Sequence, residues 1–183
     1  MVKARRAAAA LLLMGATAPA LGLETEAASE YRLKAVFLYN FAKFVQWPPE
    51  PQAEGGAFVI GILGRDPFGS TLDATMEGKS VEERKIVVRR VTRAEDLRSC
   101  RILFISSSER ERLSGIFKQV GGDAILTVGE TTGFAEKGGV IRFRVEGDRV
   151  RLEINVAAAE RSRLKISSQL LRLAQIVGPA RGD

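Results

Sequence analysis

Two short motifs and one cysteine are the residues of this sequence whose types and spacing could do chemistry. The segment 162–165, Ser-Arg-Leu-Lys, matches the S-x-x-K nucleophile motif of penicillin-interacting serine enzymes, but the companion S-D-N and K-T-G elements are absent. Gly64 and Gly69 have the spacing of a phosphate-binding loop, yet Ser70 stands where that motif needs a lysine. The chain has no His and 1 Cys, which excludes Ser-His-Asp and Cys-His catalysis and the usual zinc ligands. We therefore expect no enzyme, no metal and no cofactor.

The loop 64–69 still marks a candidate ligand cleft. It follows a predicted strand and precedes a predicted helix, which is where doubly wound proteins place ligands. Asp66 lowers the positive potential there and Pro67 lacks an amide donor, so a tight connection is the default and a phosphate site the alternative. A small-molecule cleft would use Gly64, Asp66, Phe68 and Gly69, together with Gly129 to Gly133.

The elements that must position these residues alternate between strand and helix. The segments 57–63 and 101–105 are continuously apolar, as expected for strands covered on both faces. Such alternation implies right-handed crossovers and parallel strands. We predict a three-layer, doubly wound α/β fold with a mostly parallel sheet. The expected strands are 57–63, 85–91, 101–105 and 124–128; the expected helices are 30–46, 70–77, a turn with a Thr92–Glu95 capping box, and one with a Ser108–Glu111 capping box that buries Leu113, Ile116, Phe117 and Val120.

A hairpin is predicted after Gly138-Gly139, where VIRFRVEGDRVRLEIN alternates strictly around a Gly147-Asp148 type II′ turn. One hairpin face is apolar, through Ile141, Phe143, Val145, Val150, Leu152 and Ile154. The polar face pairs Arg142 with Glu153 and Arg144 with Arg151, a like-charge pair that an acidic partner or anion would relieve. These four residues are the candidate partner-binding site, and a solvated face is the alternative. Two helices should follow, over 156–163 and 168–177, the second buried through Leu170, Leu171, Leu173, Ala174 and Val177.

The first 20 residues have the layout of a secretory signal peptide: a basic start, a short apolar run and small residues before a cleavage site after Ala20. Three of the 28 basic residues lie in it and none of the 22 acidic ones, which leaves 25 against 22, or about +3. Nucleic acid therefore has little electrostatic support as a partner. We expect an exported protein with a flexible tail over 21–29 and a single domain over 30–178.

Cys100 begins the RILFI strand. A buried, inert thiol is the simplest expectation; an exposed one could pair between molecules or respond to oxidation. The helix 30–46 is apolar nearly all round, so it either packs between sheet and helices or presents part of its surface to another protein.

Six blocks of the sequence, taken in order, resemble the YfiR family of periplasmic proteins. They are EYRLKAVFLYNFAKFVQWP, IGILGRDPFGSTL, CRILFISSSE, LTVGETTGFAEKGGVIRF, LEIN and ISSQLLRLA. The resemblance implies a periplasmic, often dimeric α/β repressor. It would bind the periplasmic sensor region of an inner-membrane diguanylate cyclase and lower cyclic di-GMP and biofilm formation. An outer-membrane lipoprotein of OmpA-like type would sequester it. The alternative is a periplasmic small-molecule-binding protein.

The sequence departs from the best-understood members of that family in its cysteines. Those members form disulfides that make repression redox-sensitive, and one bridge would join the position of Cys100 to that of Gly61. With Cys100 alone, no intrachain disulfide can form. Relief of repression is therefore expected from a partner or ligand.

Overall fold

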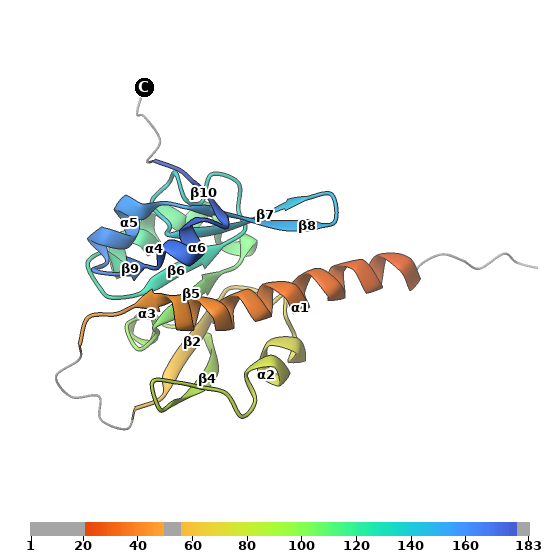
Figure 1. Cartoon of the computed structure of the whole chain (residues 1–183), viewed down its shortest axis with the longest axis horizontal. Coiled ribbons are helices and arrows are strands. Elements are labelled where there is room, and N and C mark those ends of the chain that lie inside the picture. Colours follow the sequence, from red (N-terminus) through yellow and green to blue (C-terminus); the bar gives the residue numbers. More distant parts are fainter. Residues whose placement is uncertain (1–20, 50–55, 179–183) are drawn as a thin grey trace, which may run out of the picture.

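The computed structural model describes residues 21–49 and 56–178, and its centre is one eight-stranded sheet (Figure 1). Its strands are β2 (Phe58–Leu63), β3 (Ser80–Val81), β4 (Arg84–Val91), β5 (Ile102–Ile105), β6 (Leu126–Gly129), β7 (Ile141–Glu146), β8 (Arg149–Ile154) and β10 (Ala174–Ile176). Their order in the sheet is β10-β8-β7-β6-β5-β2-β4-β3, and the five strands from β7 to β4 run parallel. A separate pair is formed by β1 (Val45–Gln46) and β9 (Lys165–Ile166).

The predicted α/β fold with a mostly parallel sheet is confirmed. The expected signal peptide, residues 1–20, lies outside the described residues.

Helices cover both faces of the sheet, so the core has two clusters. Ile60 of β2 belongs to the same cluster as Phe41, whereas its neighbour Val59 belongs to the cluster that contains Ile116. Successive strand side chains point to opposite faces, which accounts for the continuous burial of β2. The helices are α1 (Leu21–Phe44), α2 (Ser70–Met76), α3 (Ala94–Leu97), the 3-10 helix η1 (Ser107–Arg112), α4 (Leu113–Val120), α5 (Val156–Arg161) and α6 (Ser168–Leu171).

The predicted tail over 21–29 is wrong, because α1 begins at Leu21. The stretch is rich in Leu, Glu and Ala, which favour helix, and extending an existing helix is easier than nucleating one. The other end comes two residues earlier than predicted. Val45 and Gln46 leave the helix to pair with Ile166 and Lys165.

The second C-terminal helix is predicted too long. It ends at Leu171, and residues 174–176 form β10, which pairs in parallel with β8. Leu173, predicted to be buried in this helix, is 69% exposed, and Ile176 is 53% exposed. A contact between distant segments explains the difference. Without β10, the backbone N–H and C=O groups at the edge of β8 would have no partner strand, and residues 174–176 form hydrogen bonds with them instead of continuing the helix.

Both predicted capping boxes are also wrong. α3 is preceded by Arg93, which makes no side-chain cap. η1 is capped by Ser106, whose hydroxyl accepts from the Ser108 amide. The predicted buried face of the following helix is nevertheless present. Leu113, Ile116 and Val120 are buried there, and Phe117 is partly buried against the same cluster.

Candidate functional site

The hairpin β7–β8 has the predicted register. Arg142 lies opposite Glu153, and Arg144 lies opposite Arg151. Gly147 has a φ of 60°, as the first turn residue of a type II′ turn requires. Strict two-residue alternation around a short turn fixes this register, because a slip by one residue would move every side chain to the other face.

The arginines of the polar hairpin face form ion pairs within the chain. Glu153 is nearly buried and accepts a 2.8 Å bond from Arg142. Arg144 lies 3.3 Å from Glu153 and 2.6 Å from Glu146, while Arg151 lies 3.6 Å from Glu146. Glu146 thus lies near both members of the like-charge pair and offsets part of their repulsion, while the candidate partner-binding site stays a prediction. Arg144 and Arg151 remain partly exposed, whereas Arg142 and Glu153 are largely covered.

The opposite, apolar hairpin face forms one wall of a groove. Val145 is 45% exposed at the outer end of β7, although the inner positions of the same face are buried. The facing wall is the amino-terminal half of α1, which projects from the body of the molecule on the same side as the hairpin (Figure 1). We call this hollow of about 500 Å³ the α1–hairpin groove; its lining residues are Glu26, Ala27, Ser29, Glu30, Leu33, Val145, Gly147, Asp148 and Val150.

The projecting part of α1 has little to pack against in its own chain. Residues 26–29 are all exposed, and Leu33 and Val36 are 42% and 41% exposed. Short helical segments without tertiary packing are marginal in water. The groove therefore presents apolar side chains on two projecting elements, with Glu26 and Asp148 among its lining residues. This arrangement suits a partner that has apolar and basic side chains.

An ion-pair cluster fixes α1 against the sheet beside the groove. The Lys34 side chain is 2% exposed; its Nζ lies 2.6 Å from Oε2 of Glu130 and 2.5 Å from Oε1 of Glu30. Glu130 directly follows β6. The Tyr31 hydroxyl donates to the Glu130 carboxylate at 3.2 Å, and Lys34 Nζ lies 4.4 Å from the Tyr31 ring centroid. Sequence analysis missed this cluster, and its one signal was a lysine in a nearly all-apolar helix.

Tyr31 should remain protonated in alkaline solution. Burial raises its pKa above the usual value, and the charge of Glu130 and the hydrogen bond to it act in the same direction. Its contribution to stability is therefore complete below about pH 10, the ordinary pKa of a phenol, and is lost as the pH rises beyond it. We expect a Tyr39→Phe variant, whose one remaining tyrosine is Tyr31, to show a phenolate absorbance step well above pH 10. The same variant unfolded in denaturant should titrate at the ordinary pKa of a tyrosine. If the folded and unfolded proteins gave the same titration curve, the proposed contact of Tyr31 with Glu130 would be wrong.

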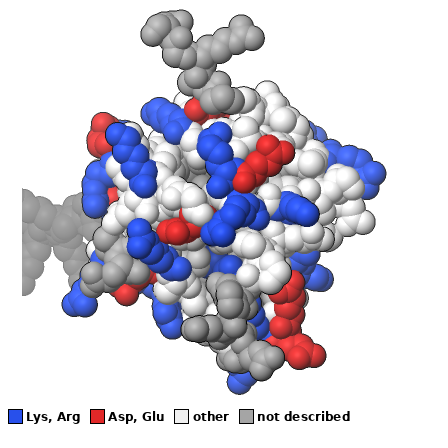
Figure 2. All heavy atoms as spheres, turned by 90° about the vertical axis from the view of Figure 1, so that its left-hand side faces the viewer, with Lys and Arg blue, Asp and Glu red and all other residues white. Residues whose placement is uncertain are grey.

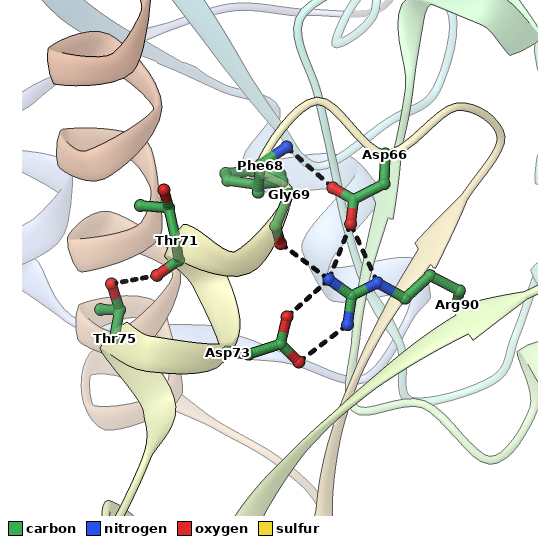
Figure 3. A network of polar contacts seen from close by, with 7 residues as sticks. All are labelled: Asp66, Phe68, Gly69, Thr71, Asp73, Thr75 and Arg90. Carbon is green, nitrogen blue, oxygen red and sulfur yellow. Dashed lines mark hydrogen bonds and ion pairs between the residues drawn. The ribbon is translucent and has the colours of Figure 1, made fainter.

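The loop 64–69 is engaged in contacts within the chain (Figure 3). Arg90 of β4 donates to Asp66 from Nε at 2.9 Å and from Nη2 at 2.7 Å, and it also bonds Asp73 and the Gly69 carbonyl. These bonds lower the pKa of Asp73 and raise that of Arg90. Asp66 Oδ1 accepts from the Phe68 amide at 2.8 Å, the kind of donor that a phosphate would need. The network ties β4, the loop and α2 together.

Side chains also fill the space beside this loop, where the sequence predicts a ligand cleft. Phe68 is buried between Tyr31 and Phe104, at ring centroid distances of 5.3 and 4.8 Å. A β-carbon on Gly64 would lie 2.5 Å from the Ser108 hydroxyl. In the segment 129–133, Glu130 is bonded to Lys34 and Tyr31. The residues of the predicted cleft therefore lie in contact with their own chain.

Cys100 is buried, and burial raises the pKa of its thiol. A side-chain carbon on Gly61 would overlap its Sγ atom. The two positions that the family resemblance joins by a disulfide are therefore side by side, with glycine in place of the second cysteine. The buried position of the thiol agrees with the expectation that Cys100 is chemically inert.

Within residues 21–49 and 56–178, no group of three or more Cys, Asp or Glu side chains has a metal-binding arrangement. No helix among those residues is long and apolar enough to cross a membrane.

A comparison with models of protein families gives a match over most of the chain. The model of the YfiR/HmsC-like family matches residues 31–175. No curated protein matches the chain. The matched segment begins at Tyr31 in α1 and ends in β10, so it includes the hairpin and nearly all of the sheet, together with Tyr31, Lys34 and Glu130 of the ion-pair cluster. The chain therefore belongs to the YfiR/HmsC-like family.

Proposed function

We propose that this protein is a periplasmic repressor that binds the periplasmic sensor region of an inner-membrane diguanylate cyclase and holds the cyclase inactive. Cyclic di-GMP and biofilm formation then fall. Family membership supports a regulatory, periplasmic role in general. The observation that carries the docking proposal is the α1–hairpin groove, where Leu33 and Val145 are exposed on two projecting elements.

The charge of the groove indicates the kind of partner segment. Glu26 and Asp148 stand on opposite walls, one on α1 and one at the hairpin turn. A second copy docked through the same groove by two-fold symmetry would bring like charges together. The favoured occupant is therefore an amphipathic segment of the cyclase with an apolar stripe flanked by Lys or Arg. A homodimer would use another surface, and an OmpA-like lipoprotein could compete for this one.

We expect the double variant Leu33→Gln/Val145→Thr to capture the cyclase region at least tenfold more weakly in a pull-down. Both side chains are exposed, so the variant should fold with a stability within about 0.5 kcal/mol of the wild type. The matched control is Val87→Thr, an apolar side chain 36% exposed on β4. Cyclic di-GMP should rise in cells that carry the groove variant and stay low with the control.

The polar hairpin face provides the competing arm of this experiment. Charge reversal at Arg144 and Arg151 tests the docking site suggested by the sequence. Loss of binding in that variant alone would move the docking site to the polar face while leaving the function standing. A wild-type protein that binds no cyclase region and leaves cyclic di-GMP unchanged in a deletion strain would reject the function itself.

A further inference from the structure

The sheet has an open edge along β4. Within the described part of the chain, residues 87–91 pair with β2 on one side and with no strand on the other, because β3 reaches only Arg84 and Lys85. The Ile86 amide points to the β3 side, where it donates to Lys79 O at 3.0 Å. Backbone groups alternate in direction along a strand, so those of Val88 and Arg90 also face this side. Such an edge can accept a further strand.

A hollow of about 900 Å³ lies beside this edge, between α2 and the β3–β4 hairpin. Ser70, Asp73, Ala74 and Glu77 line it from the α2 side, and their spacing of three and four residues places them on one side of the helix. Residues 85–88 line it from β4. Because Ser70 and Ala74 are small, an extended chain has room to pass between the helix and the strand.

Arg90 fixes the distance between these two walls. Its Nη2 atom donates to Asp73 Oδ2 at 2.6 Å and to Asp66 Oδ2 at 2.7 Å. Figure 3 shows this side chain reaching from β4 to Asp73 on α2. A site whose walls are already positioned loses little freedom when a segment binds.

The face of β4 that points away from α2 carries two cations. Lys85 and Arg89 lie on the same face as Val91, which belongs to the core cluster that contains Ile116. Both side chains are exposed, and neither makes an ion pair with a residue that the structure describes. Since opposite charges on neighbouring strands stabilise their pairing, acidic side chains on an added strand would suit this face.

A second copy of this chain is a poor occupant of the edge. Two β4 strands paired about a two-fold axis would bring Lys85, Arg89 and Arg90 of one chain close to those of the other. The field of the molecule also favours an acidic segment. Figure 2 shows the side on which the strands begin, where Lys and Arg side chains clearly outnumber Asp and Glu.

We propose that the open edge of β4 binds an extended segment of a partner protein, which adds to the sheet as a further strand. The segment carries acidic side chains two residues apart on the face of Lys85 and Arg89. It turns small, uncharged side chains toward α2, where Asp73 and Glu77 would repel further acidic groups. This edge is separate from the α1–hairpin groove, and the proposal does not depend on the cyclase proposal.

The probe is a capped, fluorescently labelled peptide, Thr-Val-Thr-Glu-Thr-Glu-Thr-Val-Thr, which reads the same in both directions. Its fluorescence anisotropy is measured during titration with the purified full chain. We expect saturable binding, and binding roughly fivefold weaker when Lys replaces both Glu residues. The double variant Lys85→Glu/Arg89→Glu should reverse this preference. The matched control, Arg110→Glu/Lys118→Glu, makes the same charge change on exposed side chains elsewhere and should keep it.

Two further peptides test whether the backbone pairs with β4. One is N-methylated at every Thr and the other at every Val and Glu, so each has lost the amide donors along one edge. A segment that pairs as a strand uses the donors of one edge only. We therefore expect one of these peptides to bind as the parent does and the other to lose binding. Which one binds shows whether the segment runs parallel or antiparallel to β4.

Three results would overturn the proposal. The first is no saturable binding of the Glu peptide to the wild type. The second is an unchanged preference for the Glu peptide in the charge-reversed variant, and the third is the same result for both N-methylated peptides. If the double variant fails to fold, Arg89→Glu alone decides, because that side chain is exposed.

Discussion

Replacing Lys34 with Met is expected to lower the free energy of unfolding by about 3 to 5 kcal/mol, as removal of one partner of a buried ion pair does. Lys34 Nζ lies 2.6 Å from Glu130, and their side chains are 2% and 14% exposed. The variant leaves the Glu130 carboxylate largely buried without its cation. Tyr31 then provides the remaining hydrogen bond to it. Urea unfolding followed by circular dichroism measures the loss.

The double variant Lys34→Met/Glu130→Leu separates the charge effect from simple loss of contacts. Removing both charges should restore part of the stability, because an apolar pair can replace a buried ion pair at little cost. Lys43→Met is the matched control on the same helix, where Lys43 is exposed, and it should change stability by less than about 0.5 kcal/mol. A double variant less stable than Lys34→Met would contradict this account of the cluster.

Local patterns predicted the hairpin correctly for a physical reason. Alternation from Ile141 to Ile154 fixes which face of each strand is apolar, and the Gly147-Asp148 turn fixes the register. The same pattern could not predict how far the hairpin extends past the body of the molecule. Val145 belongs to the apolar face, yet it is 45% exposed because α1 faces it across the groove instead of packing on it.

The errors lie where distant segments decide the structure. The apolar spacing of residues 168–177 fits a helix, but the open edge of β8 captures residues 174–176 as a strand. Lys34 and Glu130 are 96 residues apart, so no local pattern brings them together.

The groove and the ion-pair cluster are coupled through α1. Lys34 fixes the helix one turn away from Glu30, which lines the groove. A partner that docks on the projecting part of α1 therefore meets an element with a rigid base and an exposed end. A segment that docked there would have to order only the exposed end of the helix, which limits the entropy cost of binding.

Replacing Phe134 with Ala is expected to cost about 3 to 5 kcal/mol, the usual range for a fully buried phenylalanine. The ring is 0% exposed and packs edge-on against Phe117 at 5.2 Å between centroids. It fills the space between Gly129 and Gly139, where a side chain on either glycine would overlap it. Phe134 lies in the loop 130–139, which also supplies Glu130 to the ion-pair cluster. Within this loop the Gly139 amide donates a 3.0 Å hydrogen bond to the Phe134 carbonyl.

Gly139→Ala tests the same packing from the other side. Its methyl group would overlap the Phe134 ring, so we expect a loss of about 1 to 3 kcal/mol from overpacking. Gly115→Ala is the matched control: nothing lies within 4 Å of its added carbon, and it lies in α4, where Ala is favoured over Gly. Combining Gly139→Ala with Phe134→Leu should cost less than the sum of the two single changes, because the smaller side chain makes room for the methyl group. Strictly additive losses of stability would mean that the two side chains do not compete for the same space. The ring of Phe134 would then not be packed against Gly139 as described.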